Sequence, residues 1–184
     1  SVLLIIDIGT TFLKIGLFDN LTRPIQDIQY KVSHPLIINN DGTNEFNPYE
    51  ICELIETTID KIVLELNNNY EILAVAVDSL ASTFLGLDKN KKPVTNVFTY
   101  ADTRAKIQME DIKNEVDIEK VYNRTGCPIH TAYVPAKVRW LNSEFPDIYE
   151  QVEHWCDFST YLYTRWFSNQ DVPCSYSIAS WSGL

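Results

Sequence analysis

The sequence predicts an α/β fold in which a mixed sheet is flanked by helices. Two short apolar runs rich in β-branched residues, Leu3–Ile8 and Leu13–Asp19, are separated only by Gly9–Thr11, which is the pattern of a β-hairpin. A helical pattern follows, and then Ile72–Val77 forms a nearly continuous apolar run of the kind found in strands covered on both faces. Because a strand–helix–strand order implies a crossover to a parallel neighbour, these observations define the fold class.

The first half of the chain supplies the elements of this sheet in order. A turn-like stretch at 20–24 leads into a third extended segment, Ile25–Val32, so the chain opens with three antiparallel strands before the parallel ones. Asn47, Pro48 and Glu50 supply an N-cap, a proline at the first helical position and part of a capping box. An apolar helical face follows, with Asn67–Asn69 as the expected stop; it consists of Ile51, Leu54, Ile55, Thr58, Ile62 and Leu66.

The second half is predicted to pack helices around the same sheet. Thr83–Leu87 and Val94–Tyr100 have the composition of further extended segments, joined by a solvated turn. After Asp102 the apolar residues recur at helical spacing, with Gly and Pro as punctuation, over Arg104–Glu115, Ile118–Asn123, Ala136–Glu144 and Phe158–Phe167. We therefore expect residues 1–184 to form one sheet-centred domain.

Composition and charge exclude several classes of protein. The 184 residues are 45% apolar and 22% charged, which argues against disorder and low-complexity repeats. Fifteen Lys and Arg against 25 Asp and Glu give a formal charge of -10, a field that repels nucleic acid but leaves room for a local phosphate pocket. No apolar run approaches the roughly 20 residues of a membrane helix, and the four scattered cysteines lack metal-binding spacing, so we expect reduced thiols in a cytoplasmic protein.

The hairpin turn carries the motif with the clearest chemistry. Gly9 allows close backbone approach to an anion, Thr10 and Thr11 offer hydroxyls and amides to phosphoryl oxygens, and Lys14 adds a positive charge. Asp7, at the end of a buried strand, is suited to hold Mg²⁺. The motif is neither a Walker loop nor Gly-x-Gly-x-x-Gly, and an ordinary hairpin turn is the alternative interpretation.

Further segments accompany this motif in order along almost the whole chain. They are Leu4–Lys14, Glu45–Pro48, Lys92–Pro93, Tyr100–Arg104, Arg124–His130, Lys137–Leu141, Phe145–Asp147 and Ser175–Ser180, followed by Gly183–Leu184. With these segments the sequence resembles the amino-terminal domain of the FGGY carbohydrate kinases, which share the ribonuclease H-like fold of the actin and Hsp70 type ATPases. Thr-Gly-x-Pro-Ile-His and Ala-Asp-x-Arg bring it nearest to the gluconate kinase and xylulose kinase branches.

The resemblance implies ATP-dependent phosphoryl transfer to a sugar, sugar acid or polyol hydroxyl, with ATP and Mg²⁺ as cofactors. Asp7 would then belong to the metal site, and the residues facing the phosphates would be Gly9, Thr10, Thr11 and Lys14. The residues near the sugar would be Asp78, Leu80, Ala81, Asp102 and Ala132. The base aspartate and most of the adenosine site would lie beyond Leu184, so we expect residues 1–184 to be one inactive lobe of a two-lobed kinase. A homodimer is an open possibility.

Several alternatives stay open. Leu80 and Ala81 stand where the family often has large or charged sugar contacts, so a non-catalytic sensor or interaction module of the same fold is the second hypothesis. A free-standing carbohydrate-binding domain is the third. Asp102 with Arg104 forms either a substrate pair or a structural ion pair. We expect His130 to be a loop histidine satisfied by backbone, the other two histidines not to bind metal, and most tryptophans to be core residues.

Overall fold

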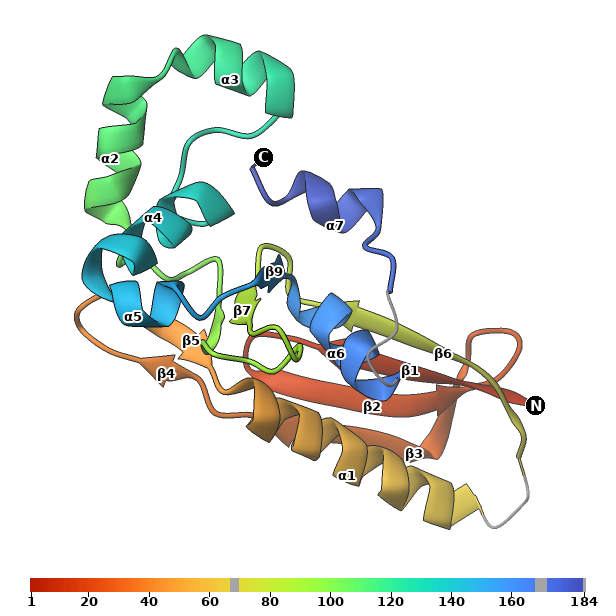
Figure 1. Ribbon diagram of the computed structural model, residues 1–184. Helices are drawn as coiled ribbons and strands as arrows, with labels where there is room; N and C mark the ends of the chain where they lie inside the picture. The colour runs from red at the N-terminus through yellow and green to blue at the C-terminus, as the bar shows by residue number, and fades with distance from the viewer. Residues whose placement is uncertain (67–69, 168–171, 184) are drawn as a thin grey trace. The chain divides into compact units, whose positions relative to one another are not determined.

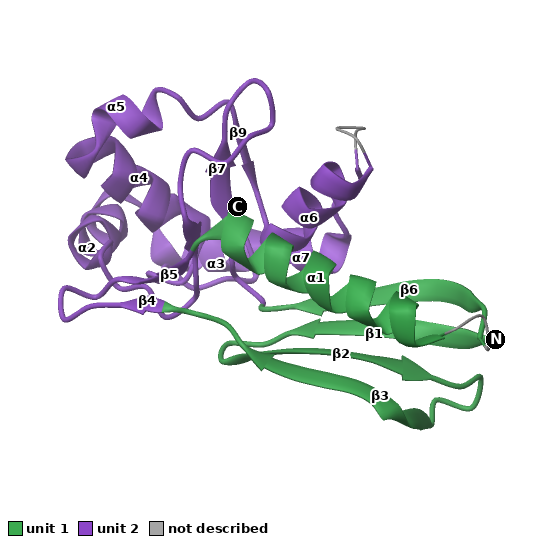
Figure 2. Cartoon of the chain, turned by 90° about the horizontal axis from the view of Figure 1, so that it is seen from below, with its two compact units in different colours: residues 1–36, 47–80 green, residues 37–46, 81–184 purple. Residues whose placement is uncertain are grey.

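The computed structural model describes residues 1–66, 70–167 and 172–183, and its contacts divide the chain into two compact units. Unit 1 comprises Ser1–Leu36 and Asn47–Leu80, and unit 2 comprises Ile37–Phe46 and Ala81–Leu184 (Figures 1 and 2). The helix stop predicted at Asn67–Asn69 lies outside the described residues. No helix of the described chain is long and apolar enough to cross a membrane.

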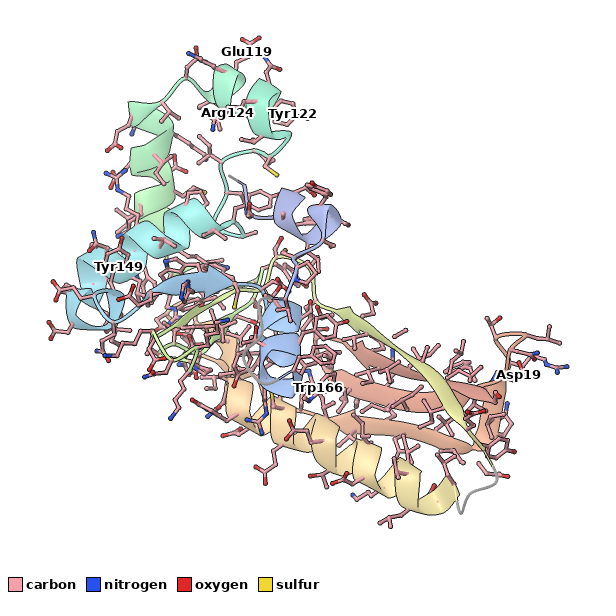
Figure 3. All side chains as sticks on the ribbon, turned by 45° about the vertical axis from the view of Figure 1, so that its right-hand side comes forward. Asp19, Glu119, Tyr122, Arg124, Tyr149 and Trp166 are labelled. Carbon is pink, nitrogen blue, oxygen red and sulfur yellow. The ribbon has the colours of Figure 1, made fainter. Side chains whose placement is uncertain are left out.

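Unit 1 contains a four-stranded sheet in the order β3-β2-β1-β6. The predicted hairpin is confirmed as β1 (Val2–Ile8) and β2 (Phe12–Phe18), which pair antiparallel from Leu3↔Phe18 to Ile8↔Leu13. The predicted third strand is β3 (Pro24–Ser33), antiparallel to β2. Asp19 stabilises the turn between them, because its carboxylate accepts hydrogen bonds from the amides of Leu21 and Arg23 (Figure 3).

Helix α1 (Pro48–Leu66) begins where the capping residues predict and covers β2 and β3. The side-chain oxygen of Asn47 accepts from the amide of Tyr49, so the predicted N-cap is confirmed. Alternate residues of β1 and β2 are buried, as expected for strands with one covered face: Val2, Leu4, Ile6 and Ile8 in β1, and Leu13, Ile15 and Leu17 in β2. Four of the predicted face positions of α1, Ile51, Ile55, Thr58 and Ile62, are fully or almost fully buried.

Strand β6 (Ile72–Ser79) runs parallel to β1, so the predicted crossover is confirmed. The expectation that both of its faces are covered is wrong, because Leu73 is 62% and Val75 is 52% exposed. Two features of the described residues explain this difference. α1 packs over β2 and β3, and β6 is the edge strand of its sheet.

Unit 2 has strands of its own, of which the sequence predicted only those near β7 and β8. β4 (Ile37–Ile38), β5 (Asn44–Phe46) and β8 (Val97–Phe98) form one small sheet, and β7 (Leu85–Leu87) pairs with β9 (His154–Cys156). The four predicted helices are confirmed as α2 (Lys106–Glu115), α3 (Ile118–Thr125), α4 (Val134–Glu144) and α6 (Phe158–Trp166). Two short helices, α5 (Pro146–Tyr149) and α7 (Tyr176–Ser180), were not predicted.

The core of unit 2 is aromatic and lies between its short strands and its helices. Phe98 of β8 packs edge-on against Trp140 of α4 with ring centroids 6.1 Å apart, and Phe84 lies 5.3 Å from Phe98. Ala105, Met109, Ala136 and Leu141 complete this cluster. Helix α3 lies outside it and buries no residue; Figure 3 shows Glu119, Tyr122 and Arg124 on this exposed helix.

Candidate functional site

The turn between β1 and β2 is exposed and closes tightly. The amide of Gly9 donates to the Phe12 carbonyl oxygen over 3.1 Å, and a Cβ atom at Gly9 would lie only 3.1 Å from that oxygen, so glycine suits the position. Thr10 and Thr11 are exposed, and no acceptor among the described residues takes a hydrogen bond from the amide of either one. The turn therefore presents two threonine amides and two hydroxyls to solvent.

A row of charged residues crosses the sheet beside this turn. Asp7 on β1 pairs in register with Lys14 on β2 and with Asp78 on β6, while Lys14 pairs with Lys31 on β3. Residues in direct register share one face of a sheet, so these four side chains line the same face, opposite the one that carries α1. Lys14 Nζ lies 2.7 Å from Asp7 Oδ2, with the side chains 56% and 37% exposed.

This arrangement suits an anion accompanied by a divalent cation. Lys14 and the free amides can contact phosphoryl oxygens. The carboxylates of Asp7 and Asp78, which come from neighbouring strands, are oxygen ligands of the kind that Mg²⁺ combines with waters and substrate phosphates. The described residues contain no group of three or more metal-ligating side chains, and an Mg²⁺ site of this open kind does not need one.

The predicted sugar residues are distributed over both units. Asp78 lies near the end of β6 in unit 1, beside Asp7, and Leu80 is the last residue of that unit. Ala81 is exposed and is the first residue of the second segment of unit 2, Ala81–Leu184. Asp102 follows β8, and Ala132 is half-buried in the loop before α4. The structure thus brings Asp78 together with Asp7 and Lys14, while a direct sugar contact by any of these five residues stays a prediction.

Asp102 lies in a buried ion-pair cluster of unit 2. Its carboxylate is 1% exposed and accepts from the Asn44 amide at 3.0 Å and from the Arg104 guanidinium at 2.7 and 3.0 Å. Arg104 also pairs with Glu45 and lies 4.4 Å over the Trp140 ring. These carboxylates raise the pKa of Arg104 against the opposing effect of burial. This geometry supports the structural ion pair, one of the two roles that the sequence left open.

Lys137 completes this cluster, and its place there was not predicted. It lies on α4, is only 1% exposed, and its ammonium donates to the Thr99 carbonyl oxygen. Burial lowers the pKa of Lys137 to about 8, although the nearby Asp102 opposes the shift. The helical spacing of the sequence could have indicated this burial, because Lys137 lies between the apolar residues Ala136 and Trp140 on the buried face of the helix.

His130 takes its expected structural role, whereas the expectation for the tryptophans is not met. His130 Nδ1 accepts from the Ala132 amide at 3.0 Å, which confirms a loop histidine satisfied by backbone. Of the four tryptophans only Trp140 is buried, and Trp181 is 49% exposed, so the expectation that most of them are core residues is wrong. His34, one of the two histidines for which the sequence predicts no metal-binding role, is buried against the hairpin turn, with Nε2 2.6 Å from the Gly9 carbonyl oxygen.

Fold and turn together define an α/β domain with an exposed Gly-Thr-Thr turn at its first hairpin. The chain belongs to the FGGY family of carbohydrate kinases: residues 2–184 match the description "FGGY family of carbohydrate kinases, N-terminal domain". The resemblance seen in the sequence and the predicted fold class are thereby confirmed.

Individual relatives agree with this assignment. The chain is 30% identical over 184 residues to a gluconokinase of Bacillus subtilis, covering 100% of this chain and 35% of the relative. It is similar to the crystal structure of gluconate kinase from Lactobacillus acidophilus, with a TM-score of 0.78 and 25% identity. The match covers 100% of this chain and 36% of that kinase chain. The fold also matches the crystal structure of Plasmodium falciparum glycerol kinase with ADP, with a TM-score of 0.81 and 20% identity. This match covers 89% of this chain and 33% of the glycerol kinase chain. The chain thus spans about a third of the length of these relatives.

Proposed function

We propose that this chain is the amino-terminal, sugar-binding part of an ATP-dependent carbohydrate kinase, with residues 1–184 acting as one domain of the longer protein. The acceptor is a hydroxyl of a sugar, a gluconate-like sugar acid or a polyol. Family membership supports the class of reaction, and the observation that carries the proposal is the exposed turn beside the Asp7–Lys14 pair. A cytoplasmic location and a possible homodimer belong to the same proposal.

In the proposed reaction the acceptor oxygen forms a bond to the γ-phosphorus of ATP while the bond to the departing ADP oxygen breaks. Lys14 and the Thr10 and Thr11 amides bind the phosphoryl oxygens and offset their negative charge. Asp7, with Asp78 beside it, would hold Mg²⁺, which when bound neutralises charge on the phosphates. The proton of the acceptor hydroxyl passes to a base aspartate that the family resemblance places outside these residues.

On the sugar side, the proposal assigns Asp78, Leu80, Ala81, Asp102 and Ala132 to the pocket. The apolar side chains of Leu80 and Ala81 cannot hydrogen-bond a hydroxyl, so they would shape the pocket without reading its polar groups. Asp102 would act mainly by holding the segment that carries the exposed Tyr100, because its carboxylate is engaged by Arg104 and Asn44. The acceptor is expected to resemble gluconate in size, in line with the gluconokinase relative.

The test uses the full-length protein with Mg·ATP and a panel of sugars, sugar acids and polyols, and it measures ADP formation. Lys14→Met is expected to lower kcat/KM for ATP by about tenfold to a hundredfold, the usual effect of losing a hydrogen bond to a charged group. Lys31→Met is the matched control. Lys31 lies next to Lys14 on the same sheet face, its ammonium sits 4.1 Å over the Phe12 ring, and its removal should change kcat/KM less than twofold.

Three results would contradict the proposal. Absence of sugar-dependent ADP formation across the panel would favour the sensor or interaction module. Sugar binding that needs no nucleotide and is unchanged by Thr11→Ala would favour a carbohydrate-binding domain. Sugar-dependent ATP consumption by residues 1–184 alone, at the rate of the full-length protein, would contradict the assignment of the base outside this chain.

A further inference from the structure

His34 links the end of β3 to the turn between β1 and β2. The residue is 5% exposed, and Nε2 of its imidazole lies 2.6 Å from the Gly9 carbonyl oxygen. Because a carbonyl oxygen only accepts hydrogen bonds, Nε2 carries the proton in this contact. The backbone amide of His34 donates to the Thr11 carbonyl oxygen at 3.4 Å, so one residue holds the turn at two points.

These contacts determine where an amide of the turn points. The C=O of Gly9 and the N–H of Thr10 belong to one planar peptide unit and point in opposite directions. A Gly9 carbonyl held toward the buried imidazole therefore directs the Thr10 amide away from the protein. Thr10 is exposed, and its amide has no acceptor among the residues that the structure describes.

The backbone of His34 is itself restricted by the next residue. Pro35 disfavours the helical region for the residue before it and biases His34 toward an extended conformation. Ser33 pairs with Phe12 at the end of the β2–β3 ladder, which fixes the point from which His34 begins. The imidazole is thus placed by a strand end on one side and by a proline on the other.

We propose that His34 is a positioning residue for phosphate binding, which holds the Gly9–Thr10 peptide so that the Thr10 amide faces the nucleotide phosphates. This inference rests on the proposed kinase function. His34 touches neither nucleotide nor sugar in this proposal and acts only through the peptide that it orients. The Gly9 amide closes the turn onto Phe12 while the Gly9 carbonyl oxygen faces His34, so both polar groups of this residue have a partner within unit 1.

The kinetic test compares His34→Leu with His34→Gln in the full-length protein. Leucine removes the donor but retains an apolar side chain, whereas the glutamine amide can donate to the same carbonyl. His34→Leu is expected to raise KM for Mg·ATP by about threefold to tenfold, the range of one neutral hydrogen bond, with KM for the sugar changed less than twofold. His34→Gln should restore most of the loss. His154→Leu, at an exposed histidine of β9, is the matched control and should change neither constant.

Hydrogen exchange of residues 9–12 supplies a readout that does not depend on turnover. Mg·ATP should slow exchange of these amides in the wild type and in His34→Gln, and much less in His34→Leu. If the wild type binds Mg·ATP at this turn but phosphorylates no sugar, the kinase proposal fails and the positioning role stands. Equal protection in all three proteins, or a His34→Leu variant that loses sugar and ATP affinity together with thermal stability, would overturn the positioning role.

Discussion

The buried ammonium of Lys137 makes a quantitative prediction about stability and pH. Its pKa is about 8 in the folded protein and has the ordinary value of 10.5 when the chain unfolds. Between these pH values the unfolded state holds a proton that the folded state has released, so the free energy of unfolding rises with pH. From pH 7 to pH 9.5 the two pKa values give a gain of about 2 kcal/mol from this one side chain.

The experiment is urea denaturation of the wild type and of Lys137→Met at pH 7, 8, 9 and 9.5. Methionine retains the unbranched apolar stem and removes the ammonium, so the wild-type free energy minus the variant free energy should rise by about 2 kcal/mol over this range. Cys156 also titrates, because burial raises the pKa of its thiol to about 12. Its contribution is present at neutral pH and is lost above pH 9, but it is common to both proteins and cancels in the difference.

Lys106→Met, at an exposed position of α2, is the control for removing a lysine as such. Its difference from the wild type is subtracted before the Lys137 result is interpreted. A Lys137 difference that stays constant within about 0.5 kcal/mol from pH 7 to 9.5 would refute the argument that burial releases the proton of this lysine.

Five further substitutions test helix caps, backbone conformation and burial within each unit. Asp157→Ala should lower the free energy of unfolding by about 2 kcal/mol in urea, because this α6 N-cap accepts from the Thr160 amide and two hydroxyls; Asp117→Ala at α3, with one amide donor, should cost about 1 kcal/mol. Gly42→Ala should cost about 1–2 kcal/mol in the same assay, because Gly42 has φ 96°. Leu73→Thr on exposed β6 should change stability by less than about 0.5 kcal/mol and reduce aggregation measured by light scattering, whereas Ile6→Ala should cost about 2–5 kcal/mol. Equal costs for the two caps, an unchanged Gly42→Ala midpoint, or a Leu73→Thr protein as destabilised as Ile6→Ala would contradict these assignments.

The elements that the sequence predicted are those defined by local signals. The hairpin follows from two apolar runs and a short turn, and α1 follows from its cap and its apolar face, all within neighbouring residues. The missed strands β4, β5 and β9 are only two or three residues long. β5 and β9 pair with distant segments, since Glu45 pairs with Phe98 and Cys156 with Leu85, and among the described strands β4 pairs only with β5. No local periodicity marks such pairs, because their stability comes from a partner far along the chain.

The same distinction holds within the candidate site. The Asp7–Lys14 pair follows from the hairpin register, which the turn length fixes. The position of Asp78 beside Asp7 depends on a parallel pairing formed across α1, and the Asp102 contact to Asn44 spans 58 residues. Chemistry-bearing residue types were therefore recognisable in the sequence, whereas their partners required the fold.

The Asp7–Lys14 pair would let a chain with a formal charge of -10 bind the phosphates that we propose for this turn. Both side chains are partly exposed, and ion pairs of this kind contribute only about 0–1 kcal/mol. Lys14 can therefore leave Asp7 for a phosphate oxygen at little cost, and the carboxylate that it leaves becomes available to a cation beside Asp78. A buried pair such as Arg104–Asp102 could not exchange partners in this way, because breaking it leaves an uncompensated charge inside the protein. The exposed pair is thus suited to binding, and the buried one to holding its segment in place.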